Sequence, residues 1–251
     1  MRDIASVLLT EGAREGSVDP ARMTTYVYIY RPNGGAPATS AVTDGCLKPA
    51  GAATLAETAG ARVVTIHRRQ IAASRNAGAR EAQGDILFFI DADTRIGAEH
   101  VAGARAALSS GCVGGGARVE FRDEIPFWAR IFVSVFGRLY FAANLGAGAF
   151  LFTTREFFDR AGGFDEQYFA GEEVYFTQAL KKLGRFRLIA DPVVTSGRKL
   201  RMYSARDVLG GLGAILLRGK RAVRSRDRLD LWYDGKRETE LSKPTAGNGL
   251  R

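Results

Sequence analysis

Two aspartates, Asp91 and Asp93, follow a run of five apolar residues at positions 86–90. Residues two apart in an extended chain point to the same side. Two carboxylates placed in this way can hold a divalent cation that also takes phosphate oxygens. The same residues could instead cap a turn and the helix that starts after Thr94. The spacing alone therefore leaves a metal site and a structural role open.

A second pair of carboxylates, Glu172 and Glu173, stands at the start of a helix predicted to run to about Leu183. Adjacent carboxylates raise each other's affinity for protons, whereas a helix N-terminus lowers it. One of the two could act as a general base. The alternative is that the pair only complements the helix dipole, since acidic first turns are common.

Three cations could contact an anionic ligand. Arg198 and Lys199 follow a predicted strand end and could clamp departing phosphates, with a plain solvated surface as the alternative. Arg75, in a helix predicted over residues 71–82, could face a nucleotide or form an ordinary helix salt bridge.

The elements that would position these residues alternate between helices and strands. The sequence predicts helices at 52–59 and 71–82 and strands at 61–66 and 85–90. This β-α-β order favours right-handed crossovers and a parallel sheet, whose strand ends face the ligand crevice. The continuous apolar run at 86–90 is typical of a strand buried on both faces. We therefore expect an α/β fold with a mostly parallel sheet flanked by helices.

Four motifs occur in a fixed order along the chain. R-N-x-G at 75–78 precedes D-x-D at 91–93, and G-G-F-D-E at 162–166 precedes E-E at 172–173. This order resembles that of the family-2 glycosyltransferases, which have the Rossmann-like GT-A fold. The resemblance covers about residues 42–200. It implies an inverting transfer of a sugar from a nucleotide-diphosphate sugar to an acceptor hydroxyl.

The resemblance also implies roles for individual residues. Asp93 would ligate Mg²⁺ or Mn²⁺ directly, and Asp91 would contact the ribose or a metal-bound water. Asp44 stands where the family places a nucleotide-contacting Asp. Glu173 stands at the position of the catalytic base, where the family typically has Asp. Processive members of the family carry a Q-x-x-R-W segment C-terminal to the part that corresponds to residues 193–201. This sequence has no such segment there, which favours a single transfer.

The N-terminal part departs from the family pattern, because it lacks the usual P-x-Y-N-E-like turn. We expect a divergent segment at 1–42, a GT-A-like core at 43–203 and a helical, basic tail at 204–251. The departure leaves open a non-catalytic module that binds a partner or a membrane. A sugar-phosphate nucleotidyltransferase is a further alternative, but its Gly-rich phosphate loop matches Gly34 and Gly35 poorly.

The charge of the 251-residue chain is +9, and cations concentrate between Arg218 and Arg228. Such a cluster can bind an anionic membrane surface or nucleic acid, or it can be a solvated helix face. No aromatic residues interleave with it, so we expect no nucleic-acid partner. A helix predicted at 127–141 is apolar nearly all round apart from Arg130 and Arg138. We expect this helix to be buried, for example against a second copy in a homodimer; the alternative is that it lies on a membrane. Together with the basic cluster it suggests a lipid-linked acceptor, and a carbohydrate acceptor stays open.

Cysteine and histidine usage argues against a Cys/His zinc site and a His-based triad. Cys46 and Cys112 are far apart, and His67 and His100 are the only histidines. Free thiols are typical of a reducing compartment. No signal peptide is recognisable, and the longest uncharged stretch, 139–154, is too short and Gly-rich to span a bilayer. The expected location is the cytoplasm, peripherally on the inner face of the cell membrane.

Overall fold

The computed structural model describes residues 24–30, 39–44, 62–66, 68, 70–91, 93–218 and 223–224. The strands are β1 (Thr24–Tyr30), β2 (Thr39–Asp44), β3 (Arg62–Ile66), β4 (Ile86–Asp91), β5 (Cys112–Gly116), β6 (Val119–Phe121), β7 (Phe150–Thr154), β8 (Arg185–Leu188) and β9 (Val193–Thr195). The helices are α3 (Ile71–Glu81), α4 (Ala98–Ser109), α5 (Phe127–Ala142), α6 (Arg155–Ala161), α7 (Glu172–Leu183), α8 (Arg198–Met202) and α9 (Ala205–Arg218).

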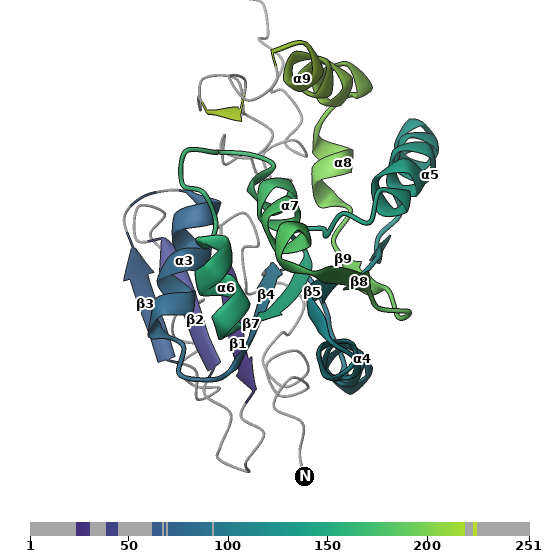
Figure 1. Cartoon of the computed structure of the whole chain (residues 1–251). Coiled ribbons are helices and arrows are strands. Elements are labelled where there is room, and N and C mark those ends of the chain that lie inside the picture. The colour runs from purple at the N-terminus through teal and green to yellow at the C-terminus, as the bar shows by residue number, and fades with distance from the viewer. Residues whose placement is uncertain are drawn as a thin grey trace, which may run out of the picture.

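A seven-stranded sheet in the order β3-β2-β1-β4-β7-β5-β8 forms the centre of the fold (Figure 1). The predicted α/β architecture is confirmed, and the sheet is mixed. β2 pairs parallel with β3 and β5 with β8, whereas β1 pairs antiparallel with β2 and β4, and β7 with β4 and β5. The strands expected at 61–66 and 85–90 are not neighbours, because β2 and β1 lie between them. The alternation of helices and strands predicts crossovers but does not specify which strands pair.

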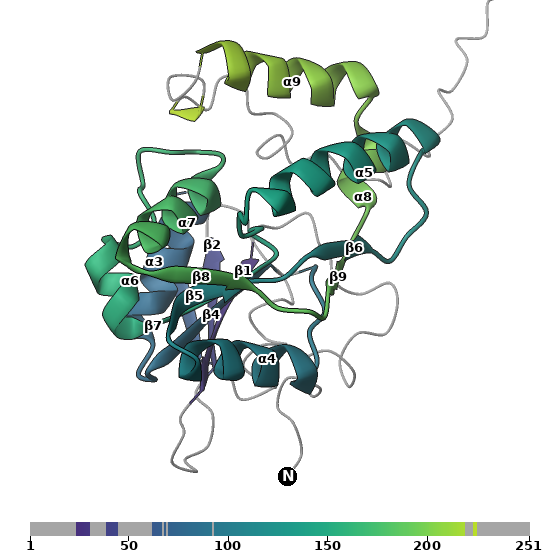
Figure 2. The ribbon, with the colours of Figure 1, turned by 45° about the vertical axis from the view of Figure 1, so that its right-hand side comes forward.

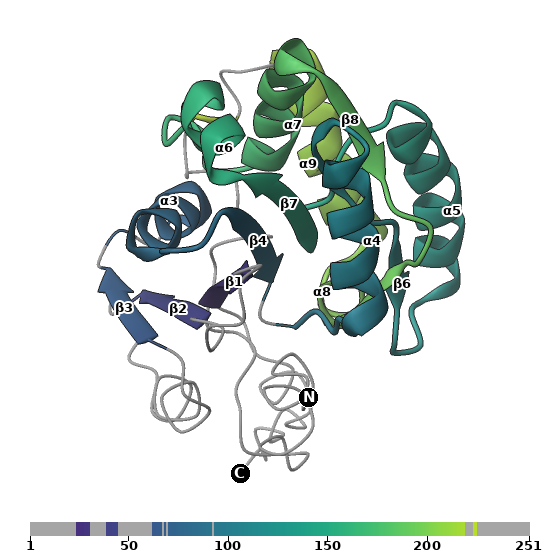
Figure 3. The same ribbon diagram turned by 60° about the horizontal axis from the view of Figure 1, so that its bottom comes forward.

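The central strand β4 is buried on both faces, as predicted. Leu87 and Phe89 contact the core under α3, α6 and α7. Phe88 and Ile90 contact the core under α4 on the other face. Alternate side chains of a strand point to opposite faces, so one short apolar run supplies both cores. Figure 3 shows the sheet between these two layers of helices.

Several strands end at the same edge of the sheet. Asp44, the last residue of β2, is paired with Ile66 at the end of β3. Asp91 ends β4 and is paired with Thr25 near the start of β1. β7 begins at this edge with Phe150. The edge therefore collects the ends of β2, β3 and β4, where the sequence predicted the site.

Three helices, α5, α8 and α9, lie together on one side of the sheet (Figure 2). The predicted helix at 127–141 is present as α5, but Ala129 is its only buried residue. The expectation that this helix is buried is therefore wrong for a single copy of the chain. No helix among the described residues has the length and apolar character needed to cross a bilayer. Of the late basic cluster, residues 219–222 and 225–228 fall outside the described residues, as does the helix predicted at 52–59.

Candidate functional site

A single buried arginine joins the two predicted carboxylate pairs. Arg75, on α3, donates from Nη1 to Oε1 of Glu172 at 2.8 Å. Its Nη2 donates to Oδ1 of Asp91 at 3.0 Å and to the carbonyl oxygen of Gly148 at 3.1 Å. The Arg75 side chain is 2% exposed. The end of β4 and the start of α7 are thus held on one guanidinium.

The surroundings of Arg75 keep it charged. Burial alone would lower the pKa of Arg75, but the carboxylates of Asp91, Glu172 and Glu173 outweigh burial and raise it. The guanidinium also lies 5.1 Å from the ring centre of Phe164, at cation–π distance. Of the two roles expected for Arg75, salt bridges are present, although to other elements and not within its helix, and a contact with a nucleotide stays a prediction. Arg75 thus joins the acidic groups at the end of β4 and at the start of α7.

Asp93 lies beyond the end of β4, half-buried. Its Oδ1 accepts a hydrogen bond from Oγ1 of Thr195 at 3.1 Å. Burial and the neighbouring charge of Asp91 raise the pKa of Asp93, while Lys199, the Thr195 hydroxyl and Arg198 oppose the shift. The two aspartates therefore lie close enough to repel one another, and Lys199 and Arg198 lie close enough to counter that repulsion. A further cation between the aspartates would relieve the repulsion more fully.

The aspartates fit an open metal site better than an enclosed one. Among the described residues no cluster of three or more His, Cys, Asp or Glu side chains could surround an ion. The side chain of Asp91 is 40% exposed. Mg²⁺ and similar hard cations are commonly bound by one or two carboxylates, with substrate phosphates and water completing the shell. Asp91 and Asp93 suit that arrangement, and their assignment as ligands stays a prediction.

The acidic pair Glu172 and Glu173 opens α7, as predicted, directly after Gly171, whose φ is +71°. Burial and Glu173 raise the pKa of Glu172 to about 8, although Arg75 opposes the shift. Burial also raises the pKa of Glu173, again opposed by Arg75. The pair therefore has a higher affinity for protons than free carboxylates have. Such a pair suits proton exchange near neutrality.

Tyr140 of α5 lies beside this pair. Its hydroxyl donates to the carbonyl oxygen of Gly146 at 2.8 Å. Burial raises the pKa of Tyr140, and the charges of Glu173 and Glu172 raise it further. The end of α5 is therefore near the proposed acid–base pair, which the sequence did not indicate.

The G-G-F-D-E loop is held by a residue that the sequence analysis left without a role. Asn76 accepts the backbone N–H of Phe164 through Oδ1 at 2.9 Å. Its Nδ2 donates to the carbonyl oxygen of Phe164 at 2.8 Å and to Oε1 of Glu166 at 3.0 Å. A Cβ on Gly163 would lie 2.9 Å from Asn76 Oδ1, so glycine suits this close approach. The signal for this contact was the Asn that directly follows Arg75.

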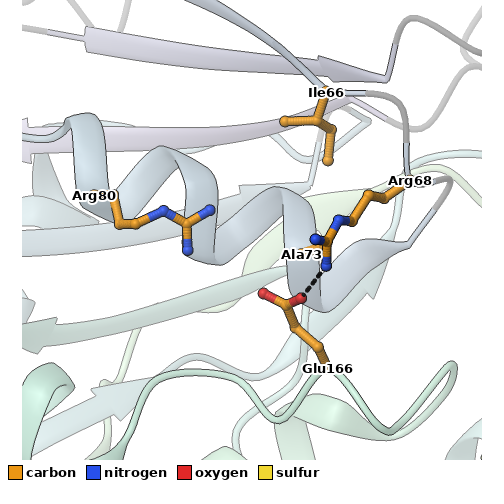
Figure 4. A pocket seen from close by; sticks show the side chains of 5 residues that line it. All are labelled: Ile66, Arg68, Ala73, Arg80 and Glu166. Atoms are coloured by element: carbon orange, nitrogen blue, oxygen red, sulfur yellow. Dashed lines mark hydrogen bonds and ion pairs between the residues drawn. The ribbon is translucent and has the colours of Figure 1, made fainter.

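A cavity of about 590 Å³ lies between the end of β3 and α3 (Figure 4). Arg68 and Glu166 form an ion pair of 2.8 Å at its side. Ala73 and Arg80 line it from one face of α3, whereas Arg75 projects from the opposite face. Among the residues whose side chains the structure describes, the lining contains neither of the carboxylate pairs.

The remaining predicted residues lie at the same edge of the sheet or near it. Asp44 ends β2, two strands from Asp91. Arg198 and Lys199 open α8, and their charges act on Asp93. The structure thus joins the two carboxylate pairs through Arg75, and the charges of Arg198 and Lys199 oppose the upward pKa shift of Asp93.

The chain matches one family model and has a fold similar to that of solved structures. The model of glycosyl transferase family 2 matches residues 40–163. No curated protein matches the chain. A mannosyltransferase from Pyrobaculum calidifontis, solved in complex with GDP-mannose and Mn²⁺, has a similar fold with a TM-score of 0.50 and 18% sequence identity. The similarity covers 77% of this chain and 57% of that chain, so this chain spans little more than half of that enzyme's length. The chain is therefore similar to glycosyl transferase family 2 over residues 40–163, and it has the GT-A fold.

Proposed function

We propose that this protein transfers a single sugar from a nucleotide-diphosphate sugar to a hydroxyl of a carbohydrate or lipid-linked acceptor, with inversion at the anomeric carbon. The observation that carries the proposal is the Arg75 bridge. It holds an aspartate of the D-x-D motif and a glutamate of the acidic pair on one guanidinium. This contact supports the assignment of donor binding and proton acceptance to one site.

Glu173 is the proposed base. Glu172 is buried and its Oε1 is bonded to Arg75, whereas Glu173 is only partly buried. As the acceptor oxygen attacks the anomeric carbon, its proton passes to the Glu173 carboxylate. The bond between the sugar and the diphosphate breaks on the opposite side, so one displacement inverts the configuration. Glu172 positions the pair through Arg75.

The leaving diphosphate needs positive charge. Asp93 and Asp91 would hold Mg²⁺ or Mn²⁺, which when bound supplies Lewis-acid stabilisation of the diphosphate. The mannosyltransferase of similar fold was solved with Mn²⁺ and GDP-mannose, which supports this assignment. Arg198 and Lys199 act near Asp93 and would contact the departing phosphates. Asp44 would contact the nucleotide at the same sheet edge.

The test is a screen of UDP- and GDP-sugars for binding by calorimetry and for sugar release, with Mn²⁺ or Mg²⁺ and with a chelator. We expect one donor class to bind, with affinity and turnover lost on chelation. NMR of the fresh product should show the anomeric configuration opposite to that of the donor. Absence of both binding and turnover would favour the non-catalytic module. Formation of a nucleotide sugar from a sugar phosphate would favour the nucleotidyltransferase.

A further inference from the structure

Helix α5 exposes apolar side chains along one face. Phe127, Ile131, Val135 and Leu139 recur every four residues and are 77%, 52%, 56% and 68% exposed. Residues at this spacing lie on one face of a helix. An apolar face of this kind is normally buried in a core. We therefore expect this face to be covered by a partner that is not among the residues the structure describes.

The opposite side of α5 attaches the helix to the protein. Within the helix, Phe132 stacks on Phe136 with ring centres 5.3 Å apart, and Phe136, which is 39% exposed, lies 5.8 Å from Tyr140. Tyr140 bonds to Gly146, and Ala129 is buried. The attachment thus involves Tyr140 and Ala129, whereas Phe127, Ile131, Val135 and Leu139 stay exposed.

The charges around this face have one sign. The outward face of α5 also carries the exposed Arg130 and Arg138, and the helix has no acidic residue. The neighbouring helices α8 and α9 lie on the same side of the sheet (Figure 2). Together the three helices contain seven cations and one acid, Asp207; the cations are Arg130, Arg138, Arg198, Lys199, Arg201, Arg206 and Arg218. A partner for this surface must accept apolar side chains and carry negative charge.

We propose that the outward face of α5, with α8 and α9 beside it, docks on an anionic lipid surface. A helix in such an interface buries apolar side chains at the acyl boundary, while arginines reach the head groups. A second copy of the chain is the weaker occupant, because an isologous contact would bring two cationic faces together. α9 exposes Leu209 on the same side of the sheet and adds apolar area.

Docking through α5 would also bring the lipid surface toward the acidic pair Glu172 and Glu173. The charges of Glu173 and Glu172 act on Tyr140 near the end of α5. An acceptor anchored in the bilayer would then present its hydroxyl close to Glu173. This consequence rests on the proposed function, whereas the docking itself does not.

The test is sedimentation of the full chain with phosphatidylcholine vesicles and with vesicles that also contain phosphatidylglycerol. We expect binding only to the anionic vesicles, weakening as salt rises. The double variant Ile131→Ser/Leu139→Ser should lower the partition coefficient about 100-fold, since each buried aliphatic side chain contributes about tenfold. Arg138→Glu should lower it about tenfold. The matched control is Arg105→Glu on α4, which lies below the sheet in Figure 2, and it should bind as the wild type does.

Three outcomes would overturn the proposal. The wild type could bind neither vesicle or bind both equally. The double variant could sediment like the wild type, in which case other cations carry the binding. Light scattering could show a dimer that Ile131→Ser/Leu139→Ser dissociates, which would make a second copy the occupant. Donor affinity measured by calorimetry should be the same in the wild type and in all these variants. If neither the wild type nor any variant binds a donor, that result counts against the proposed function and not against docking.

Discussion

Replacing Arg75 by Met tests whether one buried cation organises the site. The substitution keeps much of the side-chain volume and removes the charge. Asp91 and the Glu172/Glu173 pair are then left partly buried without a counter-charge. Removing one partner of a buried ion pair typically costs about 3–5 kcal/mol of unfolding free energy. We expect a loss in this range, since the Arg75 side chain is 2% exposed and bonds both Asp91 and Glu172.

Two further variants calibrate that loss. Arg75→Lys keeps the charge but cannot reproduce the planar fork that contacts two carboxylates and a carbonyl oxygen, so its cost should be intermediate. Arg160→Met on α6 removes an arginine that is 52% exposed and pairs with Glu156 four residues earlier. Exposed pairs of this type contribute about 0.3–0.5 kcal/mol. Urea denaturation followed by circular dichroism measures all three changes, with the slope of the transition checked for constancy.

The pH dependence of the Arg75→Met loss gives a second, independent check. Arg75 opposes the upward pKa shifts of Glu172 and Glu173, so the variant should raise both pKa values further. A carboxyl whose folded pKa lies above its unfolded pKa favours the folded state at low pH and loses that contribution as pH rises. The difference in unfolding free energy between wild type and Arg75→Met should therefore widen as pH rises from 7 to 9, through the folded-state pKa of Glu172 near 8. A loss no larger than that of Arg160→Met, or one that stays constant across this range, would refute the reasoning.

Three other predictions concern the carboxylates. Glu173→Gln should lower the transfer rate about 10²–10⁴-fold with donor affinity unchanged. Glu172→Gln should lower the rate less, and the control Glu156→Gln should leave it unchanged. A larger loss of rate in Glu172→Gln than in Glu173→Gln would assign the base to Glu172. Asp93→Ala should abolish metal-dependent donor binding in calorimetry while the unfolding free energy changes by less than about 1 kcal/mol, and Asp191→Ala should leave binding intact; unfolding of Asp93→Ala would make Asp93 a structural cap. The pKa of Glu172, raised to about 8, predicts that wild-type stability falls as pH rises from 5 to 8, and Glu172→Gln should reduce that slope; an unchanged slope in denaturation curves would contradict this.

The strands and helices could be predicted where local patterns are strong. The apolar run at 86–90 indicated a strand buried on both faces, and the Glu172 helix begins where the acidic pair predicted it. The order of the strands could not be predicted, because β1 lies between β2 and β4 through contacts that join distant parts of the chain. The exposed face of α5 was predicted only as the alternative to burial, that of a helix laid on a membrane. An apolar helix has the same sequence pattern whether a core or an external partner covers it.

The candidate site shows a similar division. Residue types and motif order indicated which carboxylates to consider, but not how they are held. Arg75 was expected either at a nucleotide or in a helix salt bridge, and only the fold shows that it bonds Asp91 and Glu172 at once. Asn76 was missed for the same reason, since its bonds to the loop at 164–166 span almost 90 residues of sequence. Contacts over such distances depend on packing that no local pattern specifies.

The Arg75 bridge also connects the segment that defines the family with the part that would perform proton transfer. The family match ends at residue 163, so it contains Arg75, Asp91 and Asp93 but not the acidic pair. Glu172 lies outside the match, yet its Oε1 is bonded to an arginine inside it. Because the same guanidinium also bonds Asp91, a displacement of α7 would change the hydrogen bond that Asp91 accepts at the end of β4. Donor binding at the aspartates and the proton affinity of the glutamates should therefore be coupled, and Arg75 is the residue through which that coupling would act.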